Sequence, residues 1–188
     1  GNDGGVFLLA GPDWTGEKPS GITEVIKADT DFVLVAYRTQ LFGPDDLPNV
    51  ERIQAGYQAE PLSTFDKTDA PPAAPAIDWP TPLTAEDQKT SLRFFDLLDL
   101  QLRFAPTLES EREIRAGFSS IGLTGDGTFN SEALSPEMQE AFKAGMADAW
   151  AEFTTFKKDQ IDTGRVTSGQ LFGTKEELDG NYLYRMAG

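Results

Sequence analysis

The sequence predicts an α+β fold, with a small antiparallel sheet in the N-terminal third packed against a helical C-terminal part. Short apolar runs separated by Gly, Pro and Asp fill the first third of the chain, which favours strands joined by turns. Apolar residues recur every three or four positions in the second half, which favours helices. We therefore expect a strand-rich part with one helix at residues 1–65, a proline-rich connector at 66–82, and a helical part at 83–188 that packs on the first.

Three strands are expected in the strand-rich part, at residues 6–10, 22–28 and 32–38. The third is the strongest candidate because it is rich in Val and aromatic residues. Three strands alone are marginally stable, so their apolar face must be covered by helices or by protein outside this chain. A helix follows them, because an Asp suited to capping and Pro48 in the first turn precede apolar residues at helical spacing.

The helical part is expected to hold helices at residues 92–105, 110–121 and 135–162. Ser135 is predicted to cap the longest of these, with a Pro at the first helical position, where a missing N–H costs nothing. Thr84 is a further predicted helix cap because an acid follows it three residues later.

The helix at 92–105 is apolar around most of its circumference, and its charged residues occupy one narrow stripe. Such a helix is buried on most sides, so we expect it to be the central core element. We expect Asp96 and Asp99 to pair with Arg93 and Arg103 in that stripe, since a buried charge needs a partner.

The composition excludes several kinds of chemistry. The chain of 188 residues has a formal net charge of −15 and contains no Cys and no His. Thiol catalysis, Cys/His zinc sites and Ser-His triads are therefore excluded. The negative charge disfavours nucleic acid as a partner, and no apolar run is long enough to insert into a membrane. We expect no metal and no cofactor, because oxygen ligands such as Asp126, Asn130 and Glu132 do not have the spacing of a calcium loop.

Two stretches of the sequence resemble a known family. Residues 7–21, with Gly11-Pro12 and Trp14, are similar to the opening signature of the bacterial family called domain of unknown function 1254. Residues 37–62 resemble the family's second pattern, and the match departs at Ala36, where a Gly is commoner. Weaker similarity continues into the helical part, at residues 94–95, 121–129 and 180–185.

The resemblance implies a context for the chain. Family members are mostly bacterial, often exported, begin well before the position of Gly1, and usually end in a β-sandwich called domain of unknown function 1214. We therefore expect a fragment of a longer protein that is periplasmic or secreted. Its expected partner is the downstream β-sandwich domain of the same polypeptide, and a homo-oligomer is a further possibility. The family itself supplies no activity.

Three residues are weak candidates for ligand binding: Arg38, Trp14 and Asp45. Arg38 follows the best strand and is suited to holding a carboxylate or another anion. The alternative, which we favour, is an internal ion pair with Asp45 or its neighbour Asp46. Trp14 could stack on a sugar or an aromatic ligand, although a Trp beside Gly and Pro more often packs against its own turn. Trp79 is expected to hold the connector in the same way.

These observations favour a non-catalytic ligand-binding or scaffold module of an exported bacterial protein. The alternative is part of a hydrolase-like enzyme whose active site is completed by a missing C-terminal domain. In that case Arg38 would hold the anion of the substrate and Asp45 would act as the base. A third hypothesis is a structural module that forms oligomers through an exposed apolar patch. The residues alone leave open whether the protein is an enzyme.

Overall fold

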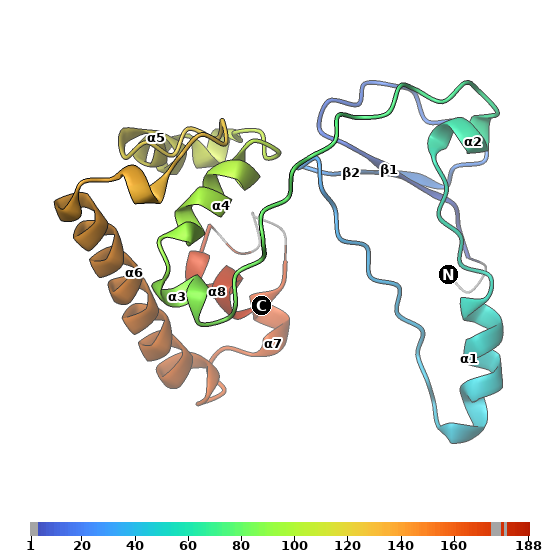
Figure 1. The fold of residues 1–188 in the computed structure, drawn as a ribbon. Coiled ribbons are helices and arrows are strands. Elements are labelled where there is room, and N and C mark those ends of the chain that lie inside the picture. Colours follow the sequence, from blue (N-terminus) through green and yellow to red (C-terminus); the bar gives the residue numbers. More distant parts are fainter. Residues whose placement is uncertain (1–3, 174–177, 179) are drawn as a thin grey trace. The chain divides into compact units, whose positions relative to one another are not determined.

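The computed structural model describes residues 4–173, 178 and 180–188 and divides the chain into two units (Figure 1). Unit 1, Gly1–Asp78, contains strands β1 (Phe7–Ala10) and β2 (Glu24–Lys27) and helices α1 (Leu47–Gln54) and α2 (Leu62–Asp66). Unit 2, Trp79–Gly188, contains the helices α3 (Asp87–Thr90), α4 (Arg93–Leu102), α5 (Arg112–Ser120), α6 (Pro136–Phe156), α7 (Ser168–Leu171) and α8 (Tyr182–Ala187).

The sheet of unit 1 differs from the prediction. Strands β1 and β2 form a two-stranded parallel sheet in which Phe7 lies opposite Glu24 and Ala10 lies opposite Lys27. The predicted antiparallel sheet is therefore wrong, and the chain is mainly helical with a small sheet. The physical reason is the connection, because parallel strands need a long crossover rather than a tight hairpin. The loop over residues 11–23 provides it, and the N–H of Thr23 donates to the carbonyl of Val6 at 2.7 Å.

The third predicted strand, residues 32–38, is also wrong. Residues 33–41 are neither helix nor strand, and the chain runs extended between β2 and α1 (Figure 1). Their backbone groups form no hydrogen bond with another residue that the structure describes. A strand needs a neighbouring strand to accept and donate its backbone hydrogen bonds. The segment is held instead at one end, where the ring of Tyr37 lies 5.0 Å from that of Tyr57 and the hydroxyls of Thr39 and Tyr57 are 2.8 Å apart.

Helix α2 was not predicted. It begins after Pro61, whose extended backbone makes a sharp helix start, and ends at Lys67, which has a φ of 55°. Its Phe65 lies against Gly21, where an added Cβ would be 3.5 Å from the ring. The buried apolar residues described in unit 1 are Ala10, Ile22 and Val50.

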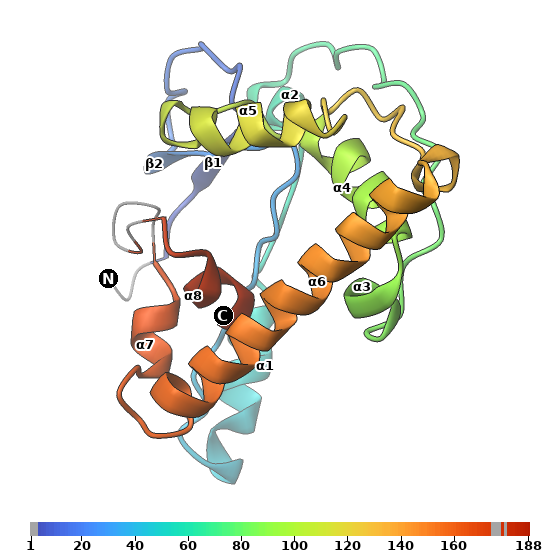
Figure 2. The same cartoon turned by 90° about the vertical axis from the view of Figure 1, so that its left-hand side faces the viewer.

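In unit 2 the core forms between α4 and α6. The ring of Phe95 on α4 meets that of Phe142 on α6 edge to face at a centroid distance of 4.6 Å, and Phe129 lies 5.8 Å from Phe142. Figure 2 shows α3 and α4 beside the long α6. The predicted start of α6 is confirmed, because the hydroxyl of Ser135 accepts a hydrogen bond from the N–H of Met138.

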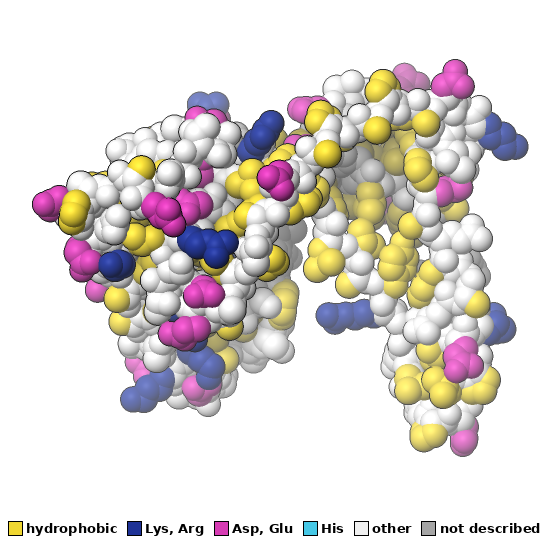
Figure 3. Space-filling view, in the orientation of Figure 1, with side chains coloured by type: hydrophobic (Ala, Val, Ile, Leu, Met, Phe, Trp, Pro, Cys, Tyr) yellow, Lys and Arg dark blue, Asp and Glu magenta, His cyan; other side chains and the backbone are white. Residues whose placement is uncertain are grey.

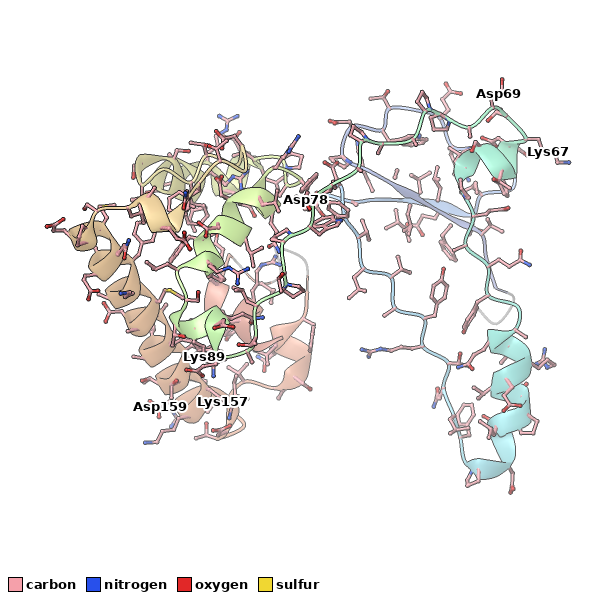
Figure 4. The ribbon with its side chains drawn as sticks, in the orientation of Figure 1. Lys67, Asp69, Asp78, Lys89, Lys157 and Asp159 are labelled. Atoms are coloured by element: carbon pink, nitrogen blue, oxygen red, sulfur yellow. The ribbon has the colours of Figure 1, made fainter. Side chains whose placement is uncertain are left out.

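Helices α3 and α8 also contact α6. The Lys89 ammonium on α3 lies 5.1 Å from the ring centroid of Trp150, and Figure 4 shows Lys89 on the side of α3 near α6. Helix α6 ends in a π-helical turn, Lys157–Ile161. The ring of Tyr184 on α8 lies 5.5 Å from that of Phe156. Within the described ranges, no helix combines the length and the apolar character needed to cross a membrane.

Candidate ligand-binding site

A clasp holds the last part of the proline-rich stretch against α4. The ring of Trp79 lies 6.1 Å from that of Phe104, just beyond the end of α4. The guanidinium of Arg93 donates a hydrogen bond to the carbonyl of Thr81 at 3.2 Å. Trp79 therefore holds the connector as predicted, and the segment over residues 79–83 runs alongside the helix.

Reciprocal hydrogen bonds between Thr84 and Asp87, which we call the Thr84 cap, close the turn that leads into α3. The N–H of Asp87 donates to the hydroxyl of Thr84 at 3.0 Å, and that hydroxyl donates to the Asp87 carboxylate at 2.7 Å. The predicted interaction of Thr84 with the acid three residues later is present, but Thr84 is not the N-cap residue of α3, because the helix begins three residues later, after Glu86. The same hydroxyl, with the N–H of Thr84 and to a smaller degree the charge of Arg93, lowers the pKa of Asp87. This cap determines where the next residue, Gln88, is placed.

A pocket of about 580 Å³ lies among the 79–83 segment, α3 and α4. Aromatic and aliphatic side chains make up most of its lining, with Trp79 and Leu83 on one side and Phe94, Leu97 and Leu98 on the other. The polar side chains in the lining are those of Gln88 on α3 and Gln101 on α4. Its volume is within the range of pockets that hold small molecules.

The pocket lining is suited to binding a neutral molecule. None of the lining residues has an ionisable side chain. The Gln88 and Gln101 carboxamides have no hydrogen-bond partner in the part of the chain that the structure describes. Each offers one acceptor and two donors to a ligand. A mostly apolar molecule with a hydroxyl or carbonyl group matches this arrangement.

Two carboxylates on the other side of α4 hold a loop. Asp99 is fully buried and accepts hydrogen bonds from the N–H groups of Gly125 at 2.7 Å and Phe129 at 3.1 Å. Asp96 accepts from the N–H and the hydroxyl of Ser131 at 2.7 and 2.8 Å. The predicted pairing of these acids with arginines is therefore wrong, because backbone N–H groups satisfy the buried charges instead.

The sequence did not predict these hydrogen bonds, which hold the loop over residues 125–131 to α4 and which we call the loop clamp. The available signal was the pair of acids three residues apart on a largely apolar helix, followed by a Gly-Asp-Gly turn at 125–127. In a helix, residues 94, 97, 98 and 101 share one face, and residues 96 and 99 lie on the other. The clamp consequently leaves the pocket face of α4 without a charged side chain.

The loop over residues 126–132, whose side-chain oxygens were considered as a calcium site, forms local turns. Asp126 accepts from the hydroxyl and the N–H of Thr128, and these bonds lower the pKa of Asp126. Asn130 accepts from the N–H of Glu132. Among the described residues, no three acidic side chains gather in a group that could hold a metal ion.

The three predicted site residues lie in unit 1, and none of them lines the pocket. Arg38 is exposed and forms no ion pair with any residue in the described ranges. The favoured pairing with Asp45 or Asp46 is absent there, because Asp46 accepts from the N–H of Phe42 instead. Asp45 is exposed.

Trp14 packs against its own loop. Its indole is half-buried and covers Gly16, where an added Cβ would lie 2.8 Å from the ring. The N–H of Trp14 also closes a turn by donating to the carbonyl of Gly11 at 3.2 Å. This geometry matches the structural alternative for Trp14, and its role as a stacking platform stays a prediction.

Comparison with known proteins bears on the family and the fold. Residues 1–61 match the model of the family described as protein of unknown function (DUF1254). No curated protein matches the chain. Among solved structures, the chain is similar to the VPA0106 protein from Vibrio parahaemolyticus, with a TM-score of 0.65 at 17% sequence identity. The alignment covers 95% of this chain and 40% of that protein.

At this level of identity the similarity concerns the fold alone, and the chain spans less than half the length of that solved structure. The family match covers both stretches that carry the resemblance in the first part of the sequence, and ends near Pro61. Over residues 1–61 the chain is similar to the DUF1254 family of proteins of unknown function.

Proposed function

We propose that the chain is a non-catalytic ligand-binding module of a larger exported bacterial protein, and that its ligand is a neutral, mainly apolar small molecule. The observation that carries the proposal is the pocket of about 580 Å³ beside α4. Its apolar lining would remove the ligand from water, and the carboxamides of Gln88 and Gln101 would orient one polar group of the ligand.

Charge supports a neutral ligand. The chain has a formal net charge of −15, so an anion approaches against the field of the whole molecule. Proton transfer to a substrate needs a titratable side chain within hydrogen-bond reach, and the pocket lining provides none. Binding without turnover therefore fits this pocket better than catalysis.

The resemblance to mostly exported family members supports a periplasmic or secreted location. It also supports a β-sandwich domain further along the same polypeptide as the partner of this module. The solved relative has a chain more than twice as long as the part that aligns here, which supports a longer protein.

A pair of probes tests the ligand class. Benzyl alcohol and benzoate have similar size, but only benzoate is charged at neutral pH. We expect benzyl alcohol to shift the NMR signals of the Gln88 and Gln101 carboxamides and the Trp79 indole saturably. Benzoate should bind at least about tenfold more weakly, because the protein repels anions.

Two matched variants locate the binding. Gln101→Trp places a large ring at the pocket and should abolish the shifts, whereas Gln58→Trp makes the same change at an exposed position of unit 1 and should preserve them. Equal binding of benzoate, or binding that Gln101→Trp does not weaken, would contradict the proposal.

One observation favours a second function, part of a hydrolase-like enzyme completed by a C-terminal domain. Arg38 is exposed and has no ion pair within the described residues, so its guanidinium is available to an anionic group, with Asp45 as the candidate base. The test is turnover of ester, glycoside and phosphate substrates by the longest polypeptide encoded around this chain.

Under this second function, Arg38→Ala should abolish turnover and leave the melting temperature unchanged. Arg52→Ala is the control, because Arg52 is also an exposed arginine of unit 1 and its guanidinium donates to the nearby side chain of Asn49. Turnover that depends on Arg38 would overturn the non-catalytic proposal, and turnover insensitive to both variants would exclude a catalytic role for Arg38.

A further inference from the structure

An extended apolar segment lies on the surface of unit 1. It spans residues 33–38 between β2 and α1, and hydrophobic side chains stand along it in Figure 3. Leu34 is 95% exposed, and Val33, Val35 and Tyr37 are about half exposed. Exposed apolar side chains are common one at a time, but a continuous run of them marks an interaction surface.

The backbone N–H and C=O groups of this segment likewise have no hydrogen-bond partner among the described residues. Residues 33–41 form no backbone hydrogen bond with any other described residue, although their conformation is already extended. Val and Tyr favour extended structure, so the local preference and the observed conformation agree. What the segment lacks for β structure is a neighbouring strand.

The side-chain pattern shows which kind of strand it would be. In extended backbone, alternate side chains point to opposite faces, so Val33, Val35 and Tyr37 share one face and Leu34 and Ala36 share the other. Both faces are apolar, which is typical of a strand inside a sheet that is covered on both sides. The contact of Tyr37 with Tyr57 already anchors one face.

We propose that residues 33–38 are a β-strand completed by pairing with an extended, apolar segment of a longer polypeptide, from outside residues 1–188. The solved structure of similar fold supports this source of the partner, because only 40% of its chain aligns here and the rest is available to supply strands. Backbone pairing would provide the hydrogen bonds, and the apolar faces would provide burial. This inference does not depend on the ligand pocket of unit 2.

A second copy of the chain is the competing occupant. Two copies would each bring a net charge of −15, so their approach is opposed by charge repulsion. A strand within the same polypeptide meets the segment at a high effective concentration and at no cost of association. We therefore commit to the intramolecular partner.

Hydrogen exchange tests the proposal in two proteins: this chain of 188 residues, and the longest polypeptide encoded around it. In the shorter protein the amides of Val33–Tyr37 should exchange at rates close to those of an unstructured peptide. In the longer protein the same amides should exchange at least about 100-fold more slowly, because β pairing protects N–H groups from solvent.

Two proline variants distinguish strand pairing of this segment from a general compaction of the longer protein. In the longer protein, Val35→Pro removes one N–H within the segment and should reduce protection of its neighbours to the level of the shorter chain. Ala74→Pro is the matched control, because it inserts a Pro into a stretch that is already proline-rich and has no regular structure. Protection of the Thr23 amide, which donates to the carbonyl of Val6 in unit 1, reports whether each variant is still folded.

Three results would overturn the proposal. The first is fast exchange of residues 33–37 in the longer protein. The second is protection in the shorter protein that grows with its concentration, which would assign the pairing to a second copy. The third is a coding sequence that contains no residues beyond these 188.

Discussion

Gly125 donates its backbone N–H to the carboxylate of Asp99 over 2.7 Å, although the two residues lie 26 positions apart in the sequence. Gly125 has a φ of 78°, and a Cβ there would come within 3.2 Å of Leu102. A glycine is therefore needed both for the backbone conformation and for the close approach to α4. This contact, with the second bond from Phe129, ties the loop after α5 to the core.

Replacing Asp99 with alanine should strongly destabilise unit 2. The variant leaves the N–H groups of Gly125 and Phe129 without their acceptor in a buried place. We expect a loss of about 3 kcal/mol in the free energy of unfolding, measured by urea denaturation. Asp148→Ala, at an exposed position of α6, is the control and should behave like the wild type. A similar loss in both variants would show that the loop clamp contributes nothing specific.

Arg115 should stabilise the end of α4. Its guanidinium donates at 3.3 Å to the carbonyl of Leu102, the last residue of α4, and at 2.9 Å to that of Ala105 just beyond it. Arg115→Met keeps the apolar stem and removes these bonds, so the free energy of unfolding should fall by about 1.5 kcal/mol. Arg112→Met is the matched control, because the ion pair of Arg112 with Glu109 is 71% and 79% exposed. Its effect should be below about 0.5 kcal/mol, and equal effects would contradict the prediction.

The cap at Thr84 should make part of the stability depend on pH. Hydrogen bonds from Thr84 lower the pKa of Asp87 below its ordinary value of 3.8. A lowered pKa in the folded state contributes stability that is fully present above pH 3.8 and disappears as the pH falls through the lowered value. In Thr84→Ala the pKa of Asp87 should rise toward 3.8, as followed by NMR titration of its carboxyl carbon.

The stability difference between wild type and Thr84→Ala should accordingly be larger at pH 7 than at acid pH below the lowered pKa. Thr90→Ala serves as the control, because the Thr90 hydroxyl donates to the backbone carbonyl of Glu86 rather than to a carboxylate. An unchanged pKa of Asp87 in Thr84→Ala would refute this account.

Gly16→Ala should displace the indole of Trp14. A Cβ at residue 16 would lie 2.8 Å from the ring, closer than atoms can pack, so the ring must move. We expect a shift of the Trp14 indole N–H signal in NMR spectra and a loss of about 1 kcal/mol in stability. Gly11→Ala is the control in the same loop, since a Cβ there meets nothing within 4 Å. An unmoved indole signal in Gly16→Ala would show that the ring does not pack as described.

Local patterns predicted the helices of unit 2 better than the sheet of unit 1. The caps at Thr84 and Ser135 were predictable because each depends on residues three positions apart. The predicted antiparallel sheet is wrong because the direction of a strand depends on where the chain returns. Nothing in the sequence indicated that the loop over residues 11–23 is a crossover between parallel strands. The predicted strand at residues 32–38 is wrong because the preference of a residue for strand is local, whereas strand pairing needs a second segment.

The candidate site was likewise predicted only in part from the sequence. Trp79 was correctly predicted to hold the connector, but the pocket between it and α4 was not foreseen. A pocket forms from side chains brought together by the chain path, here Gln88 and Gln101 from two helices. The predicted partners of Asp96 and Asp99 were arginines of the same helix. The two carboxylates instead accept hydrogen bonds from a loop that lies far along the chain.

The sequence by itself determined the excluded kinds of chemistry, the acidic charge, the cap of α6 at Ser135 and the similarity of the first 61 residues to a family, because each follows from composition or from short-range spacing. Tertiary structure decided the parallel pairing of β1 and β2, the burial of Asp99 under the 125–129 backbone, and the pocket face of α4. These features join residues that are distant in the chain, and their energies arise only when folding brings the residues into contact.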